Sequence, residues 1–76
     1  MSSNQNDVPY PEIGGHWTNS DGTRRTDIIA VRRNGHETTV TLRMPGGTKT
    51  VSLQDYSERA ERTLRKGGRY HEPITN

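Results

Sequence analysis

Apolar and polar residues alternate through the middle of the chain. The clearest stretch is 38–44, in which every second side chain lies on the same side of an extended backbone. One side carries Thr38, Val40, Leu42 and Met44, and the other carries Thr39, Thr41 and Arg43. A strand of this kind packs one face on a core and exposes the other to water. The pattern therefore predicts an antiparallel strand with one solvated face.

Turn-forming residues recur on both sides of this strand. Ser20-Asp21-Gly22, Asn34-Gly35 and Pro45-Gly46-Gly47 separate segments rich in Thr, Ile, Val or Trp. Asn-Gly and Asp-Gly supply the positive φ angles of tight hairpins, and the flanking residues suit a pleated sheet. We expect four strands joined by three hairpins in an antiparallel meander, at 16–19, 23–33, 38–44 and 48–51.

The second strand is apolar on both faces over Ile28-Ile29-Ala30-Val31. Either it is a central strand covered on each side, or it bends at a bulge. It is also longer than its partners, and bending a long strand over itself closes small barrels of the SH3 or OB type. The sequence predicts a small, curved or SH3-like sheet.

Beyond the last strand the apolar spacing changes from two residues to three or four. Leu53, Tyr56, Ala60 and Leu64 form one stripe of a helix at about 52–66. Ser52 is expected to cap the amide of Asp55, with Gly67 ending the helix. Three acid-first pairs at i and i+4 support this helix. They are Asp55 with Arg59, Glu58 with Arg62, and Glu61 with Arg65.

These elements predict a mostly β (α+β) domain at 13–67, a four-stranded meander with one C-terminal helix packed on it. A flexible arm at 1–12 and a flexible tail at 68–76 are expected to flank it, because both are poor in apolar residues. The expected core comprises Trp17, Ile28 or Ile29, Val31, Val40, Leu42, Val51, Leu53, Tyr56, Ala60 and Leu64.

Such a core is small. Only 25% of the 76 residues are hydrophobic, and no cysteine is present to form a disulfide or bind zinc through thiolates. The net charge of +2 is nevertheless too low to favour full disorder. We therefore expect either a monomer of modest stability or a core that is completed by another molecule. That molecule is a partner protein or, in a homodimer, a second copy of the chain.

No group of residues indicates catalysis. The histidines at 16, 36 and 71 have no acidic or cysteine companion at ligand spacing, so we interpret them as surface residues and expect no metal. Gly14-Gly15 and Gly46-Gly47 are too short for phosphate cradles. We expect no enzyme activity, no cofactor and no small-molecule substrate. The chain shows no secretory signal and no apolar run that spans a bilayer, which favours a cytoplasmic protein without membrane contact.

The positive charge is concentrated in the predicted sheet. Nine of the eleven basic residues are arginine, whose guanidinium group makes planar, bidentate contacts with phosphate. An arginine pair stands at each end of the second strand, so one member of each pair projects to the solvated face in either register. The candidate binding residues are Arg24, Arg25, Arg32, Arg33, Arg43 and Lys49.

Three interpretations of these cations are open. The first is a non-enzymatic module that contacts the nucleic acid backbone, DNA or RNA, through its sheet face. The second is a protein–protein interaction or inhibitor module that acts on a larger protein by strand addition or through its helix. In the third, the arginines only form a solvated face and guard the strands against edge-to-edge association. Trp17 is better explained by packing than by stacking on bases.

Between Gly14 and Leu64, Gly and Trp enter the first hairpin, several short strands follow, and Ser-Leu-Gln-Asp-Tyr opens the closing helix. This outline is similar to that of small accessory proteins of phages and mobile elements with SH3-like sheets. This resemblance is one of pattern, and fold analogy transfers no site.

Overall fold

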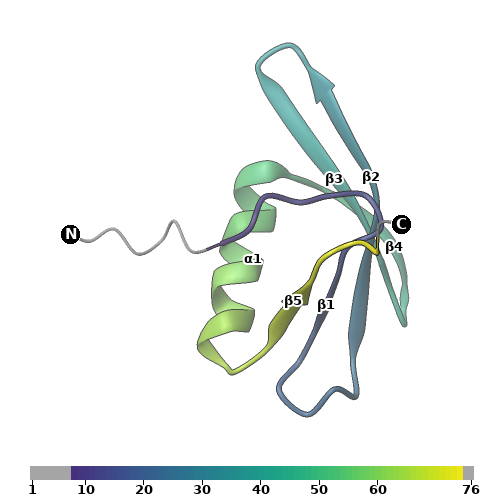
Figure 1. Ribbon diagram of the computed structural model, residues 1–76. Helices are drawn as coiled ribbons and strands as arrows, with labels where there is room; N and C mark the ends of the chain where they lie inside the picture. The colour runs from purple at the N-terminus through teal and green to yellow at the C-terminus, as the bar shows by residue number, and fades with distance from the viewer. Residues whose placement is uncertain (1–7, 75–76) are drawn as a thin grey trace, which may run out of the picture.

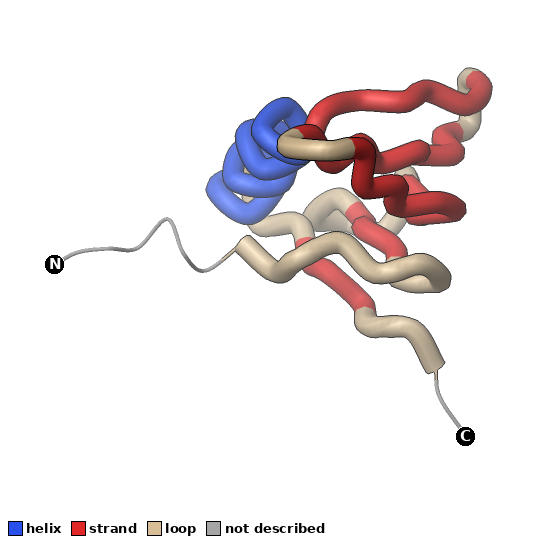
Figure 2. Tube along the Cα trace, turned by 90° about the horizontal axis from the view of Figure 1, so that it is seen from above, coloured by secondary structure: helices blue, strands red, loops and turns tan. Residues whose placement is uncertain are grey.

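The computed structural model describes residues 8–74 and contains one antiparallel sheet and one helix (Figure 1). The sheet order is β4-β3-β2-β1-β5, and the helix lies on one side of it (Figures 1 and 2). A mostly β fold with a single C-terminal helix is therefore confirmed. In chain order the elements are β1 (His16–Thr18), β2 (Arg25–Asn34), β3 (Glu37–Met44), β4 (Gly47–Ser52), α1 (Leu53–Arg65) and β5 (Arg69–His71).

Two features of the predicted sheet are corrected. The sheet has five strands rather than four, because Arg69–His71 pairs with β1. The expectation of a flexible tail at 68–76 is therefore wrong for these residues. The sheet is also open, because β4 and β5 are its opposite edges, so an SH3-like barrel is not confirmed.

A β-bulge explains the doubly apolar run in β2. The register between β2 and β3 shifts between Ile28, which faces Leu42, and Ala30, which faces Thr41. Ile28 is 1% exposed, whereas Ile29 at the bulge is 40% exposed. The extra residue changes which side of the sheet the following side chains face. The second of the two explanations offered by the sequence is therefore correct.

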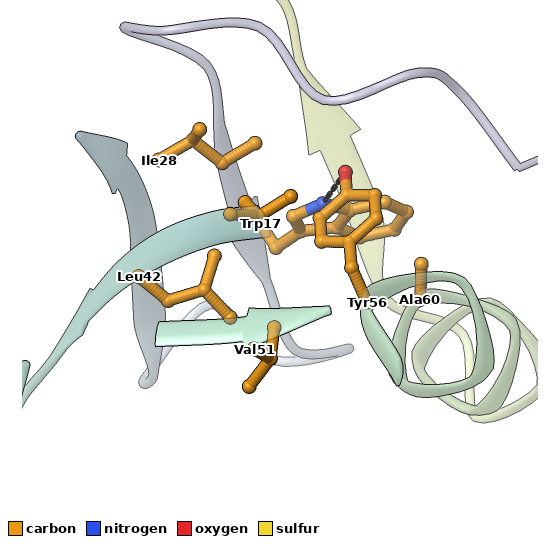
Figure 3. Packing of buried hydrophobic residues seen from close by; sticks show 7 residues of the cluster. Trp17, Ile28, Leu42, Val51, Tyr56 and Ala60 are labelled. Carbon is orange, nitrogen blue, oxygen red and sulfur yellow. Dashed lines mark hydrogen bonds between the residues drawn. The ribbon is translucent and has the colours of Figure 1, made fainter. Parts of the chain in front are cut away.

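The core lies between the sheet and one face of α1 (Figure 3). Val31 and Leu53 are half-buried, and Leu64 is 36% exposed, so the predicted stripe of the helix is less completely covered than expected. Val8 and Tyr70, which the sequence analysis left out of the core, pack against it. The buried hydrophobic cluster consists of Trp17, Ile28, Val40, Leu42, Val51, Tyr56 and Ala60.

The predicted helix caps are present. Ser52 Oγ accepts a hydrogen bond from the Asp55 amide at 3.1 Å, and Gly67 adopts a φ of 91° after the helix. Of the three predicted i, i+4 ion pairs, only Glu61 with Arg65 forms within residues 8–74, at 3.7 Å. In this part of the chain, no helix is both long enough and apolar enough to cross a membrane.

The segment before β1 contributes to the fold. Residues 1–7 of the arm expected at 1–12 lie outside the described residues, and so do residues 75–76 of the expected tail. Pro11 is buried, and Val8 packs on the core. The Gly14 amide donates to the Ile28 carbonyl, and the Ile28 amide donates to the Gly15 carbonyl, both at 2.9 Å. These bonds continue the β1–β2 pairing beyond the strand.

Candidate functional site

The side of the sheet opposite α1 carries most of the polar strand residues. Cross-strand partners share a face, and Trp17, Ile28, Leu42 and Val51 mark the side that faces the helix. The alternate positions form what we call the outer face, and in Figures 1 and 2 no helix lies on it. It comprises His16, Thr18, Arg25, Asp27, Ala30, Arg32, Asn34, Glu37, Thr39, Thr41, Arg43, Thr48, Thr50, Ser52, Arg69 and His71.

Three of the six predicted binding residues belong to this outer face. Arg25 pairs with Thr18, Arg43 pairs with Asp27, and Arg32 pairs with Thr39 beyond the bulge. All three arginines are exposed. Each arginine pair of β2 thus contributes one member, as the alternation of side chains predicts.

The other three predicted residues lie elsewhere. Arg33 pairs with Thr38, and Lys49 pairs with Leu42, which places both on the helix-facing side of the sheet. Arg24 precedes β2 and lines, together with Lys49, an open groove beside the β3–β4 turn. The six cations therefore divide between two surfaces. Three of the six share the outer face of the sheet, so the expectation that all of them lie on one face is met by half of them.

The structure adds a fourth arginine to the outer face. Arg69 of β5 pairs with Thr18, which also pairs with Arg25 on its other side. Adjacent strands are about 4.8 Å apart, so the backbones of Arg25 and Arg69 stand about 10 Å apart with the threonine between them. We call Arg25, Thr18 and Arg69 the arginine row. The sequence analysis missed Arg69 because it assigned this segment to the tail.

A second row runs beside the first across the same strands. His16 pairs with Asp27 on β2 and with His71 on β5. The two imidazole rings are stacked, with centroids 4.4 Å apart and an interplanar angle of 11°. His71 Nε2 and Thr18 Oγ1 are 3.0 Å apart, which links this histidine row to the arginine row. Asp27, His16 and His71 thus form the histidine row.

Few outer-face cations are neutralised. Arg25 Nε donates to Asp27 Oδ1 at 2.8 Å. The arginine side chain remains 61% exposed in this pair. Within residues 8–74, the structure contains no ion pair to Arg32, Arg43 or Arg69. The outer face therefore keeps uncompensated positive charge.

The environment of His16 disfavours its protonated form. Burial lowers the pKa of His16, and the positive charge of Arg25 and the neighbouring His71 lower it further, while Asp27 acts in the opposite direction. The imidazole is therefore uncharged near neutral pH, which permits close stacking of the two rings without charge repulsion.

Threonine hydroxyls fill the rest of the outer face. Thr41 Oγ1 and Thr50 Oγ1 are 3.1 Å apart across β3 and β4, while Thr39 and Thr48 lie on the same side of those strands. Hydroxyl groups donate to phosphate and sugar oxygens without adding charge. They extend the polar surface from the two rows toward the β4 edge.

The described residues offer little to other kinds of chemistry. Among residues 8–74, no three His, Asp or Glu side chains gather in a manner suited to a metal ion. No protein-family model, curated protein or solved structure matches this chain.

One sequence signal for the missed strand exists. Arg69-Tyr70-His71 repeats the polar–aromatic–polar order of His16-Trp17-Thr18. In both triplets the aromatic residue turns toward the core, and Trp17 and Tyr70 are cross-strand partners with ring centroids 5.2 Å apart.

Proposed function

We propose that this protein is a non-enzymatic module that binds the backbone of a nucleic acid through the outer face of its sheet. The observation that carries the proposal is the gathering of Arg25, Arg32, Arg43 and Arg69 on the side opposite α1. Guanidinium groups bind phosphate oxygens with paired hydrogen bonds.

The surrounding residues suit this role. Threonine hydroxyls accompany the arginines, and only Asp27 and Glu37 bring negative charge to the strand positions of this side. A surface of this composition attracts a polyanion over a distance and holds it through several weak contacts. Binding is expected to depend little on base sequence and strongly on salt.

The test is a comparison of two double variants with equal charge loss. Arg32→Ala with Arg43→Ala removes two outer-face cations, and Arg62→Ala with Lys66→Ala removes two exposed cations at the end of the helix. Fluorescence anisotropy with labelled DNA and RNA measures affinity across a salt series. We expect the first variant to weaken binding and to reduce the salt slope by about one to two, since each phosphate contact contributes about 0.7–0.9. The second variant is expected to bind like the unmodified protein.

Two results would reject this role. One is the absence of binding at about 50 mM salt, where electrostatic attraction is strong. The other is an equal loss of affinity in both variants, which would indicate attraction by net charge alone.

A protein partner is the second candidate, and a group of exposed isoleucines favours it. Ile13 is 62% exposed, Ile74 is 91% exposed and Ile29 at the bulge is 40% exposed. Gly14 lies against Pro73, so the chain segments that carry Ile13 and Ile74 meet beside the sheet. Exposed apolar surface of this kind marks protein-interaction sites. Recovery of one stoichiometric protein partner that survives nuclease treatment would support this candidate, and a mass of twice the monomer would identify that partner as a second copy.

A further inference from the structure

We propose, resting on the nucleic-acid binding argued above, that the ligand is single-stranded and that one of its bases stacks on the His16–His71 pair while the adjoining phosphate lies on the arginine row. In a nucleotide, a planar base and a phosphate anion are joined through one sugar ring. The outer face offers a surface for each of them side by side.

The stacking surface comes from the histidine row. The rings of His16 and His71 lie nearly parallel, at 11°, with centroids 4.4 Å apart. His71 is exposed and belongs to β5, an edge strand of the sheet. One face of its ring is used by His16, and the edge position leaves the other without a neighbouring strand. Histidine is among the side chains on which unpaired bases stack.

The phosphate contact comes from the arginine row. The two rows are two residues apart along the strands, which corresponds to about 7 Å. Arg25 and Arg69 are the two cross-strand partners of Thr18, so a phosphate above Thr18 lies between two arginine residues, of which Arg25 also pairs with Asp27. The Thr18 hydroxyl also meets His71 Nε2 at 3.0 Å, which holds the stacked ring beside this row.

A duplex fits these two rows less well. Bases in a double helix are stacked on one another and present only their edges in the grooves. A flat ring pair on a sheet gains contact with a base face only when that base is unpaired. The arginines alone would serve a duplex equally, so the histidines are what distinguish the two ligands.

The experiment compares three probes of equal length with the full chain. They are a single-stranded oligodeoxynucleotide of mixed sequence, its duplex, and a strand in which the sugars carry no bases. Base–aromatic stacking contributes about 1–3 kcal/mol per base. We therefore expect the single strand to bind at least about fivefold more tightly than the abasic strand. The duplex is expected to bind more weakly than the single strand.

Two substitutions at one position separate stacking from folding. His71→Ala removes the ring, and we expect about a fivefold to tenfold loss of affinity for the single strand with no change for the abasic strand. His71→Phe keeps an aromatic surface and is expected to keep the affinity for the single strand. Thermal unfolding of both variants shows whether β5 is still in place.

The outcomes also separate this inference from the function on which it rests. Equal or tighter binding of the duplex, or equal binding of the abasic strand, would overturn the single-strand inference and leave backbone binding intact. A loss of affinity in His71→Phe as large as in His71→Ala would overturn the stacking role. No binding of any probe would remove both proposals together.

Discussion

The indole Nε1 of Trp17 donates a hydrogen bond to the hydroxyl of Tyr56 at 2.8 Å, although the two residues are 39 positions apart. The bond joins β1 to α1 inside the core, and the two rings meet edge to face with centroids 6.4 Å apart (Figure 3). A buried polar group costs free energy unless it is paired. This single contact therefore satisfies one polar atom on each side of the sheet–helix interface.

Removing the Tyr56 hydroxyl tests how much the hydrogen bond from Trp17 contributes to stability. In Tyr56→Phe the indole donor of Trp17 loses its partner in a site where Tyr56 is 2% exposed. We expect the free energy of unfolding to fall by about 1–3 kcal/mol, measured by chemical denaturation. Tyr10→Phe is the matched control, because Tyr10 is 51% exposed and its substitution should leave stability within about 0.5 kcal/mol. Equal stability of the two variants would show that the bond contributes nothing.

The dependence of stability on alkaline pH also tests the burial of Tyr56. Burial raises the pKa of Tyr56 to about 12, partly offset by the hydrogen bond from Trp17. Between about pH 10 and 12 the unfolded chain releases the proton while the folded chain keeps it, so stability falls as pH rises. We expect Tyr56 to account for about 3 kcal/mol of this loss. Unfolding curves at a series of pH values should therefore show a shallower decline in Tyr56→Phe than in the unmodified protein.

Burial also raises the pKa of Tyr70, with the negative charge of Glu12 adding to the effect. Tyr56→Phe should therefore retain a residual alkaline decline from Tyr70. A decline that is identical in the variant and the unmodified protein would contradict the role of Tyr56.

Mild acid is expected to loosen the β1–β5 edge. The lowered pKa of His16 means that the unfolded chain takes up a proton near pH 6.5 while the folded chain resists it. The groups around this imidazole are Arg25 and Asp27 from β2 and His71 from β5. The free energy of unfolding should fall as pH is lowered from about 7 toward 5.

His16→Phe keeps a ring in the stack but cannot take up the proton, so its stability should change less over this pH range. His36→Phe serves as the control, because it makes the same substitution at a histidine that is exposed in the β2–β3 turn and outside the histidine row. An acid decline in His16→Phe that is as steep as in the control, or steeper, would disprove the assignment.

The turn between α1 and β5 depends on the absence of a side chain at Gly68. An added Cβ would lie 2.6 Å from the Thr18 carbonyl oxygen and would clash with Thr63 Cγ2. Backbone cannot move aside as a flexible side chain can, so Gly68→Ala should push β5 away from β1 and cost about 1–3 kcal/mol. Gly46→Ala is the matched control, because nothing lies within 4 Å of its added Cβ. Amide exchange at Arg69 and His71, which face Thr18 and His16 in β1, and thermal unfolding measure the two effects, and equal behaviour of the variants would show that the turn adapts.

The elements of the fold that the sequence predicts correctly are those with local patterns. The Ser52 cap, the helix stripe and the three hairpins each depend on residues a few positions apart, and all of them are present. The local signal for β5 is limited to the triplet Arg69-Tyr70-His71, which is too short to predict a strand by itself. This strand has one half-buried side chain, Tyr70, and its partner strand lies more than 50 positions earlier in the chain.

The candidate site was likewise predictable only where it depends on local alternation along one strand. Alternation predicted that one arginine at each end of β2 would face solvent, and Arg25 and Arg32 do. The sequence did not indicate the position of the bulge, which decides that Arg32 rather than Arg33 joins Arg25 on the outer face. The histidine row was not predictable either, because it exists only where β5 is added to β1.

The pairing of β1 with β5 has a consequence for biosynthesis. The sheet is completed by joining a strand made early to one made near the end of this chain, while β2, β3, β4 and α1 connect neighbours in sequence. A ribosome that has released α1 but still holds Arg69–His71 leaves Trp17 without Tyr70 beside it. The nascent chain thus keeps an unfinished sheet edge until β5 emerges, and only then can His16 and His71 meet.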